Sequence, residues 1–210
     1  MRCPLCQYHH CQTFAHADGR DYFRCPSCEL TFVHPDQLPA ARAERAHYDL
    51  HENDPNDPGY RAFLDRLATP LCERLKPGSE GLDFGCGPGP ALAQMLEQRH
   101  QRMAIYDPLF FPDDTVLAQQ YDFVTCTEVV EHFHRPEKDF ALLVSLIRPG
   151  GLLAIMTSLL HDEIDFRKWH YRRDPTHVCF YRQHTFGRIA DKHGLRVCAV
   201  LHGSVIILEK

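Results

Sequence analysis

Two Cys-x-x-Cys pairs near the start of the chain constrain its fold more than any other feature. Cys3-Pro-Leu-Cys6 and Cys25-Pro-Ser-Cys28 are separated by 18 residues, which is the spacing of a four-thiolate zinc site. Each pair turns tightly enough to point two sulfurs at one tetrahedral ion, and four thiolates leave no open coordination position. A segment this short buries too little apolar surface to fold unaided. We therefore predict a structural Zn²⁺ ion bound by these four cysteines, in a zinc ribbon that spans residues 1–38.

The other residues of this segment agree with a ribbon. Residues 20–24 alternate in polarity like a strand that leads into the second pair. The alternatives are a redox-active dithiol, or replacement of one thiolate by a nearby side chain, for which the candidates are Cys11, His9, His10 and His34. The remaining five cysteines stand singly in apolar stretches, as buried reduced thiols do. They are Cys72, Cys86, Cys126, Cys179 and Cys198.

Residues 39–59 are predicted to form a linker. Prolines bracket a polar helical stretch from Ala40 to about Leu50. A longer amphipathic helix is expected from Tyr60 to Leu75, where Lys76-Pro-Gly ends it. Its apolar residues recur at helical spacing. They are Phe63, Leu64, Leu67, Leu71 and Leu75.

From Gly81 onwards, strand and helix patterns alternate. We predict strands at 81–84, 102–106, 123–127, 152–157, 196–201 and 204–208, and helices at 91–99, 136–147 and 184–192. This alternation is typical of a parallel sheet covered by helices on both faces. Only His202-Gly203 separates the last two strands, so they should form an antiparallel hairpin at one edge. The predicted fold is α/β: a Rossmann-like, doubly wound, mostly parallel sheet over residues 60–210, with an antiparallel edge strand, preceded by the zinc ribbon.

A glycine-rich segment, Leu82-Asp-Phe-Gly-Cys-Gly-Pro-Gly-Pro90, joins the first of these strands to a helix. Glycines at such a turn let the backbone approach a ligand closely. The dinucleotide fingerprint G-x-G-x-x-G requires glycine where Pro90 stands, so that interpretation fails. A tight turn without a ligand is the structural alternative.

The order D-x-G-x-G-x-G in this segment resembles the first motif of the class I S-adenosylmethionine-dependent methyltransferases. Further motifs follow in the family's order over residues 60–210. Asp107 closes the second strand, 20 residues after Gly87, where an acid reaches ribose hydroxyls. Residues 121–132 resemble the family's fourth-strand motif, and residues 148–151 resemble its turn into the fifth strand.

The resemblance implies S-adenosylmethionine as cosubstrate, with Asp83 near its methionine amino group and the glycine backbone around its amino-acid and ribose portions. The expected cofactor contacts are Asp83, Gly85, Cys86, Gly87, Gly89, Asp107, Thr127 and Glu128. Only 13 residues, 108–120, separate the second strand from the fourth-strand motif. The third strand should therefore be rudimentary, and the acid that meets the adenine amine is not identified. Asp113 and Asp114 are candidates, with a surface loop as their expected place.

Three of the 15 histidines lie where the family builds its acceptor pocket. His132 follows the fourth strand, whereas His170 and His177 follow the fifth. A neutral imidazole suits a general base near pH 7. We predict His177 as the base before the other two, because the Asp-Pro-Thr turn at residues 174–176 anchors it. In the alternative, His132 only orients a loop beside the cofactor and His170 lies at the surface. Arg172 and its neighbour Tyr171 are candidate contacts for an anionic or phenolic acceptor.

The segment Glu128-Val-Val-Glu-His132 supports a second chemistry. Its E-x-x-E-H pattern is similar to one in the ubiquinone-biosynthesis O-methyltransferases. If a helical turn forms here, positions i, i+3 and i+4 share a face. Glu128, Glu131 and His132 could then hold Mg²⁺, which would organise a catechol-like acceptor. In other relatives these positions only shape the pocket.

Three functions compete. We favour methyl transfer from S-adenosylmethionine to a small molecule, with a hydroxyl as the expected acceptor group. The first alternative is an RNA methyltransferase, because some relatives that methylate ribosomal RNA carry an N-terminal zinc module. However, residues 1–38 hold three arginines against four acids, and the basic stretch over 167–188 could face nucleic acid, an anionic metabolite or water. The second alternative is a binding module with a vestigial cofactor domain, against which the intact motifs weigh.

Composition argues against other classes of partner. The net charge of −5 gives no overall attraction to phosphate backbones. The longest apolar run, residues 152–160, is far shorter than the roughly 20 residues that cross a bilayer. The N-terminus shows no apolar signal segment. We therefore expect a cytoplasmic protein without a membrane partner, and the sequence leaves its oligomeric state open.

Overall fold

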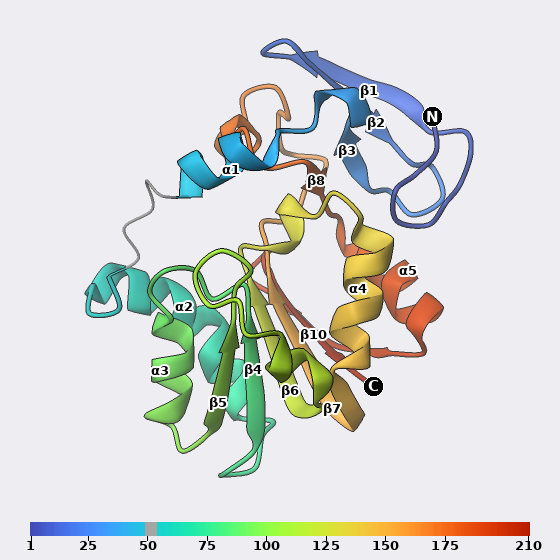
Figure 1. Cartoon of the computed structure of the whole chain (residues 1–210). Coiled ribbons are helices and arrows are strands. Elements are labelled where there is room, and N and C mark those ends of the chain that lie inside the picture. The colour runs from blue at the N-terminus through green and yellow to red at the C-terminus, as the bar shows by residue number, and fades with distance from the viewer. Residues whose placement is uncertain (49–53) are drawn as a thin grey trace.

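The computed structural model describes residues 1–48 and 54–210, which form a small sheet above a larger one (Figure 1). The small sheet has the order β1-β2-β3-β8, and the larger sheet has the order β5-β4-β6-β7-β10-β9. The strands are β1 Gln12–Ala17, β2 Arg20–Arg24, β3 Thr31–Val33, β4 Glu80–Phe84, β5 Arg102–Tyr106, β6 Tyr121–Thr127, β7 Ile147–Met156, β8 Cys179–Phe180, β9 Arg196–Leu201 and β10 Val205–Glu209. The six strands predicted beyond residue 80, and the strand predicted at 20–24, are confirmed.

Helices cover both faces of the larger sheet. They are α2 Pro58–Cys72 and α3 Ala91–Glu97 on one face, and α4 Pro136–Ser145 and α5 Gln183–His193 on the other (Figure 1). Helix α2 begins two residues earlier than predicted, because Pro58 suits a first helical position and the Asp57 carboxylate accepts hydrogen bonds from the amides of Gly59 and Tyr60. The linker helix α1, Ala41–Tyr48, is also present, and its predicted end at Leu50 lies outside the described residues.

The larger sheet differs from the prediction at its last two strands. Strands β5, β4, β6 and β7 are parallel, and β10 is antiparallel to both of its neighbours, β7 and β9. The antiparallel strand is therefore inserted beside β7, and the predicted antiparallel edge strand is wrong, because the edge strand β9 runs parallel to β7. Burial explains the order. Val205 to Leu208 are fully buried, whereas Arg196 and Val197 of β9 are exposed and suit an edge.

The apolar core forms on both faces of this sheet because side chains alternate along each strand. In β10, Val205 and Ile207 join the cluster beneath α2 and α3. Ile206 and Leu208 join the larger cluster on the other face. That larger cluster continues into the N-terminal segment and includes Leu5 and Leu30.

The predicted weakness of the third strand is confirmed. Between β5 and β6, the short 3₁₀ helix η2, Asp114–Ala118, is the one helix or strand, so β5 is an edge of the described sheet. Asp113 accepts a hydrogen bond from the Thr115 amide and begins this helix. The 13-residue connection is too short for a full helix followed by a strand.

The N-terminal segment, residues 1–33, is called the cysteine module below. Its two Cys-x-x-Cys turns have the same backbone hydrogen bonds. The Cys3 amide donates to Tyr8 and the Cys25 amide donates to Leu30, at 2.8 and 2.9 Å. In each turn the residue four positions after the first cysteine has a positive φ: Gln7 at 66° and Glu29 at 60°. Among the described residues, no helix is both long and apolar enough to cross a membrane.

Two glycine substitutions test the packing. A Cβ at Gly81 in β4 would lie 2.1 Å from Cζ of the buried Phe123. We expect Gly81→Ala to lower the free energy of unfolding by about 1–3 kcal/mol through overpacking. Gly187 lies inside α5 with open space around it, so the control Gly187→Ala should stabilise by about 0.5–1 kcal/mol. Urea unfolding measures both; equal effects of the two substitutions would contradict this packing.

Candidate functional site

The glycine turn at the end of β4 requires glycine at two positions. Gly85 and Gly87 have φ values of 77° and 65°. A Cβ at Gly85 would lie 2.4 Å from Cγ2 of Val129. The Gly85 amide donates to the Tyr106 carbonyl oxygen at 2.8 Å, which ties the turn to β5. Glycine is needed at these positions for the backbone conformation and, at Gly85, for the close approach of Val129; both glycines line the cavity described below.

Asp107 holds this turn from the end of β5. Its Oδ2 accepts a hydrogen bond from the Gly87 amide at 3.0 Å. Its Oδ1 accepts from the amides of Leu109 and Phe110 at 2.8 and 3.1 Å. One carboxylate thus organises the backbone on two sides of the same opening.

Asp83 is buried behind the turn. Its Oδ1 accepts a hydrogen bond from the Thr125 hydroxyl at 2.6 Å. Burial raises the pKa of the Asp83 carboxyl to about 6, the Thr125 hydrogen bond opposes the rise, and the negative charge of Asp107 adds to it. A carboxylate kept here at neutral pH is destabilising unless something cationic lies beside it.

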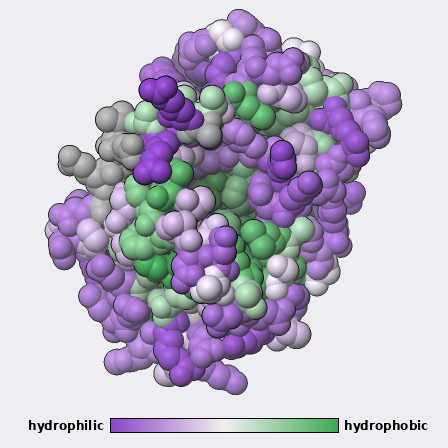
Figure 2. Space-filling view, in the orientation of Figure 1, coloured by the Kyte–Doolittle hydropathy of each residue, from purple (hydrophilic) through white to green (hydrophobic). Residues whose placement is uncertain are grey.

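A cavity of about 920 Å³ opens over the turn. In Figure 2, hydrophobic side chains gather at the centre of this face, surrounded by hydrophilic ones. The predicted site residues that line the cavity are Gly85, Cys86, Gly87, Asp107, Thr127, Glu128, His132, His170 and His177. Asp83 and Gly89 are buried outside this lining. Asp113 and Asp114 also lie outside it, on the surface, as expected.

The end of the cavity away from the glycine turn is rich in hydrogen-bonding groups. Glu131 is fully buried; its Oε1 accepts from the Tyr171 hydroxyl at 2.6 Å, and its Oε2 has no partner among the described residues. Burial, reinforced by the negative charge of Glu128, raises the pKa of Glu131 to about 8. Burial likewise raises the pKa of Glu128 to about 7. Both acids sit at a site that disfavours negative charge.

His177 lies in this region with its ring held from two directions. Its Nδ1 is 2.7 Å from the Tyr171 carbonyl oxygen, so Nδ1 carries the proton in the neutral ring. Its Nε2 is 3.8 Å from Oδ2 of Asp174. The other oxygen of Asp174 accepts from the amide and hydroxyl of Thr176, which confirms the expected turn.

The predicted i, i+3, i+4 arrangement of Glu128, Glu131 and His132 does not form. The turn that does form is the 3₁₀ helix η3, Val130–His132, and Glu128 precedes it at φ 52°. Instead, His177, from the segment between β7 and β8, joins Glu131 and His132, with one ligand atom of each within 4.8 Å of the others. His132 Nδ1 lies 3.1 Å from the Thr176 carbonyl oxygen.

Two further site features were not expected from the sequence. Helix α1 reaches the cavity: Glu44 pairs with His134 at 2.8 Å, and His47 pairs with Asp174 at 3.1 Å. No local pattern in this polar helix indicates such contacts. Arg172, expected beside the acceptor, is buried and points to the cysteine module, where its Nη2 donates to Asp18 at 2.8 Å.

The four predicted zinc ligands lie together. Cys3 and Cys28 have sulfurs 3.6 Å apart, and those of Cys6 and Cys25 are 3.5 Å apart. All four sulfurs lie within 4.8 Å of one another. A tetrahedral ion with metal–sulfur bonds of about 2.3 Å holds its ligands roughly 3.8 Å apart. The sulfur positions fit such an ion, and Cys11, His9, His10 and His34 are outside the group.

The sheet order, the glycine turn and the cavity above the carboxyl ends of the strands define an α/β methyltransferase fold. A family model described as "Methyltransferase domain" matches residues 52–200. The chain belongs to this family, and the predicted enzyme class, a methyltransferase, is confirmed.

Individual relatives match this chain either over a short stretch or at low sequence identity. A ubiquinone biosynthesis O-methyltransferase of Aeromonas salmonicida is 35% identical over an alignment of 82 residues that covers 37% of this chain and 32% of that protein. The match thus spans about a third of this curated relative. A Burkholderia thailandensis 1,6-didemethyltoxoflavin-N1-methyltransferase, solved with its acceptor and S-adenosylhomocysteine, has a TM-score of 0.55 at 13% identity and covers 95% of this chain and 99% of its own.

Two other solved structures share the fold. An O-methyltransferase family protein from Burkholderia thailandensis has a TM-score of 0.54 at 16% identity, covering 83% of this chain and 64% of its own. A complex of the Haloferax volcanii Trm112 activator with a methyltransferase has a TM-score of 0.53 at 12% identity, covering 77% and 96%. At these identities the likeness concerns the fold alone.

Asp83 provides a test of the site. Because its pKa rises from 3.8 to about 6 on folding, the unfolded chain loses this proton at lower pH, and stability falls as pH rises between the two values. Above pH 6, we expect Asp83→Asn to raise the free energy of unfolding by up to about 3 kcal/mol. Urea unfolding should show the gain at pH 8 and none near pH 4. A variant less stable than the wild type at pH 8 would contradict the raised pKa of the buried Asp83 carboxyl.

Proposed function

We propose that this methyltransferase moves the methyl group of S-adenosylmethionine to a hydroxyl of a small molecule bound in the 920 Å³ cavity. The observation that carries the proposal is the cavity itself. One end is built by the glycine turn and Asp107, and the other end by buried histidine, tyrosine and carboxyl groups. Its volume lies in the range of small-ligand sites.

At the cofactor end, the open backbone of Gly85 and Gly87 receives the amino-acid and ribose portions. The ribose hydroxyls reach Asp107, whose Oδ2 accepts one backbone hydrogen bond and keeps acceptor capacity. Asp83 does not line the cavity, so the positive amino group of the cosubstrate acts on the buried Asp83 charge without direct contact and offsets part of its cost. The solved relative with bound S-adenosylhomocysteine supports this choice of cosubstrate.

At the acceptor end, His177 serves as the base. The hydroxyl oxygen attacks the methyl carbon in line with the sulfonium, the carbon–sulfur bond breaks, and the hydroxyl proton passes to Nε2 of His177. The products are the methyl ether and S-adenosylhomocysteine. Asp174, 3.8 Å from that nitrogen, stabilises the resulting imidazolium. His132 lines the same cavity and orients the acceptor, whereas His170 lies at its exposed rim, as the surface alternative expected.

A second candidate is a metal-assisted version of the same transfer. The unpartnered Oε2 of Glu131 and its group with His132 and His177 favour a bound cation. Two imidazoles and one carboxylate suit a transition metal better than the Mg²⁺ expected from Glu128, Glu131 and His132. Such an ion would lower the pKa of a coordinated hydroxyl. His177 would then be a ligand rather than the base.

The surface charges argue against an RNA substrate. Four of the six cations in the basic stretch over 167–188 pair with acids: Arg172 with Asp18, Arg182 with Glu29 and Asp162, Lys168 with Asp165 and Arg188 with Asp191. The exposed Arg167 and Arg173 are the other two. Side chains already neutralised by acids attract a phosphate backbone weakly.

The cysteine module is proposed to hold one structural Zn²⁺ through its four sulfurs.

Calorimetric titration tests the cofactor end. We expect micromolar dissociation constants for S-adenosylmethionine and S-adenosylhomocysteine, because charged and backbone groups converge there. Asp107→Ala should weaken binding of the latter at least tenfold, whereas Glu97→Ala, exposed at the end of α3 and outside the cavity lining, should change it less than twofold. No binding by folded, metal-loaded protein would refute the enzymatic proposal and favour a binding module with a vestigial cofactor domain.

Elemental analysis tests both metal sites. We expect the purified protein to hold one Zn²⁺ per chain, which Cys25→Ser should lose because it removes one of the four thiolate donors. The metal-assisted version requires a second divalent ion, which Glu131→Gln should lose while it keeps the zinc. The control Cys198→Ser, in β9, should keep every bound ion. A single ion lost only in Cys25→Ser leaves His177 as base and sinks the metal-assisted version.

A further inference from the structure

The cysteine module contacts α4, α5 and the segment between β7 and α5 of the methyltransferase domain. We call the segment from Phe166 to Tyr181 the acceptor wall, because it carries Tyr171 and His177 into the cavity. Strand β3 of the module pairs with β8 of this wall: Thr31 lies opposite Phe180, and Phe32 opposite Cys179. The Val33 amide donates to the Val178 carbonyl oxygen at 3.0 Å. Main-chain hydrogen bonds thus reach the residue that follows His177.

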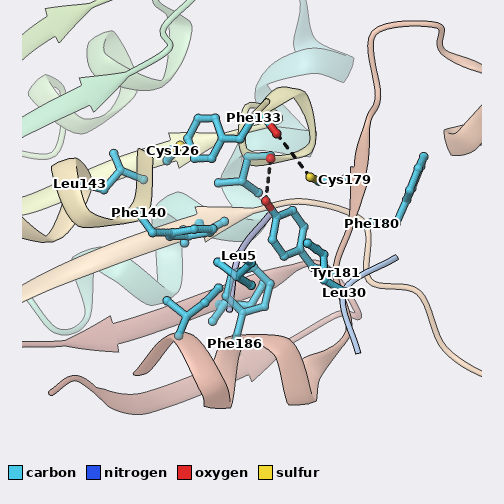
Figure 3. Close-up of a cluster of buried hydrophobic side chains, with 14 of the residues drawn as sticks. Leu5, Leu30, Cys126, Phe133, Phe140, Leu143, Cys179, Phe180, Tyr181 and Phe186 are labelled. Carbon is cyan, nitrogen blue, oxygen red and sulfur yellow. Dashed lines mark hydrogen bonds between the residues drawn. The ribbon is translucent and has the colours of Figure 1, made fainter. Parts of the chain in front are cut away.

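Apolar packing joins the two parts at the metal-binding turns themselves. Leu5 lies between Cys3 and Cys6, and Leu30 lies two residues after Cys28. Figure 3 shows these two leucines among Phe140, Tyr181 and Phe186 of the methyltransferase domain. Both are buried. The turns that gather the sulfurs therefore also insert side chains beside Tyr181, the end of the acceptor wall, and against α4 and α5.

Arg172 makes the third link. Its guanidinium is 3% exposed and donates to Asp18 at 2.8 Å and to the Tyr22 hydroxyl at 3.5 Å, both in the module. It also donates to the carbonyl oxygens of Phe166 and Arg167, at 3.1 and 2.9 Å, within the wall. A buried cation with one carboxylate partner loses much of its electrostatic stabilisation when that partner moves away.

These links end on the groups that form the acceptor site. Tyr171 precedes Arg172; its carbonyl oxygen holds Nδ1 of His177, and its hydroxyl donates to Glu131. The glycine turn has different supports, Tyr106 and Asp107. The acceptor end of the cavity therefore depends on the module, whereas the cofactor end depends on β4 and β5.

We propose that the metal-closed cysteine module is the template that orders the acceptor wall, so that its metal controls the acceptor site but not cofactor binding. Arg172 is a positioning residue in this arrangement. The inference rests on the proposed function and on the proposed cysteine-bound metal. A module of this size lacks a core of its own; once its metal is removed, β3 and Arg172's partner Asp18 no longer hold the wall.

Metal removal tests the proposal on the full chain. Zinc is stripped with a chelator or by Cys25→Ser, and amide hydrogen exchange is measured over residues 166–181. Trp169, the single tryptophan, reports locally, because its ring lies 5.2 Å from Tyr171 and 5.9 Å from Phe180. We expect amide protection at 178–181 to fall at least 100-fold and tryptophan emission to shift to the red. The affinity for S-adenosylhomocysteine should change less than twofold, and added Zn²⁺ should restore the stripped wild type but not Cys25→Ser.

A milder variant separates the link from the metal. Asp18→Asn should keep its zinc yet raise exchange in the wall at least tenfold, and Asp36→Asn, an exposed acid just after the module, should leave the wall unchanged. The proposal is overturned if the wall stays protected after metal loss, or if cofactor affinity falls in parallel. If the native protein binds no S-adenosylhomocysteine, the proposed function fails, and the exchange measurement still decides whether the module orders the wall.

Discussion

The pairing of β3 with β8 is the contact on which the arrangement of the whole molecule depends. The pairing places β8, a two-residue strand of the methyltransferase domain, in the sheet of the cysteine module. Strand β8 begins two residues after His177. Because main-chain hydrogen bonds have fixed geometry, this pairing sets both where the module sits and where the second side of the cavity stands. The buried Arg172 and the apolar cluster around Leu5 and Leu30 then consolidate one interface.

Different interactions form the two ends of the cavity. At the glycine turn, backbone amides converge on Asp107, and the site is shaped by hydrogen bonds between neighbouring strands. At the other end, side chains from α1, η3 and the acceptor wall meet only in the folded chain. There, burial raises the pKa of Glu128 and Glu131 to about 7 and 8. Such unfavourable burial of acids is common where a protein trades stability for function.

Sequence patterns predicted those features that local spacing controls. Each pair of cysteines converges because only two residues separate its members in a tight turn, and the hairpin of β1 and β2 brings the two pairs together. The positive φ of Gly85 and Gly87 needs glycine, and the short connection after β5 leaves no room for a third strand. The histidine predicted first, His177, does reach the cavity, and its role stays a prediction. Errors arose where position depended on a distant partner, as with Arg172, which turned away from the cavity to Asp18.

The sequence by itself determined the alternating α/β domain, the glycine turn with Asp107, the cysteine cluster and the family. The domain, the turn and the cysteine pairs follow from periodicity and local spacing, which backbone geometry converts directly into local structure. The family was predicted from the resemblance of the glycine-rich segment and the motifs after it. Only the tertiary structure decided that β10 lies inside the sheet, that Glu131 and His132 are joined by His177 rather than by Glu128, and that the cysteine module shares a sheet with the acceptor wall. These depend on burial and pairing between segments far apart in the chain, for which a single sequence carries no local signal.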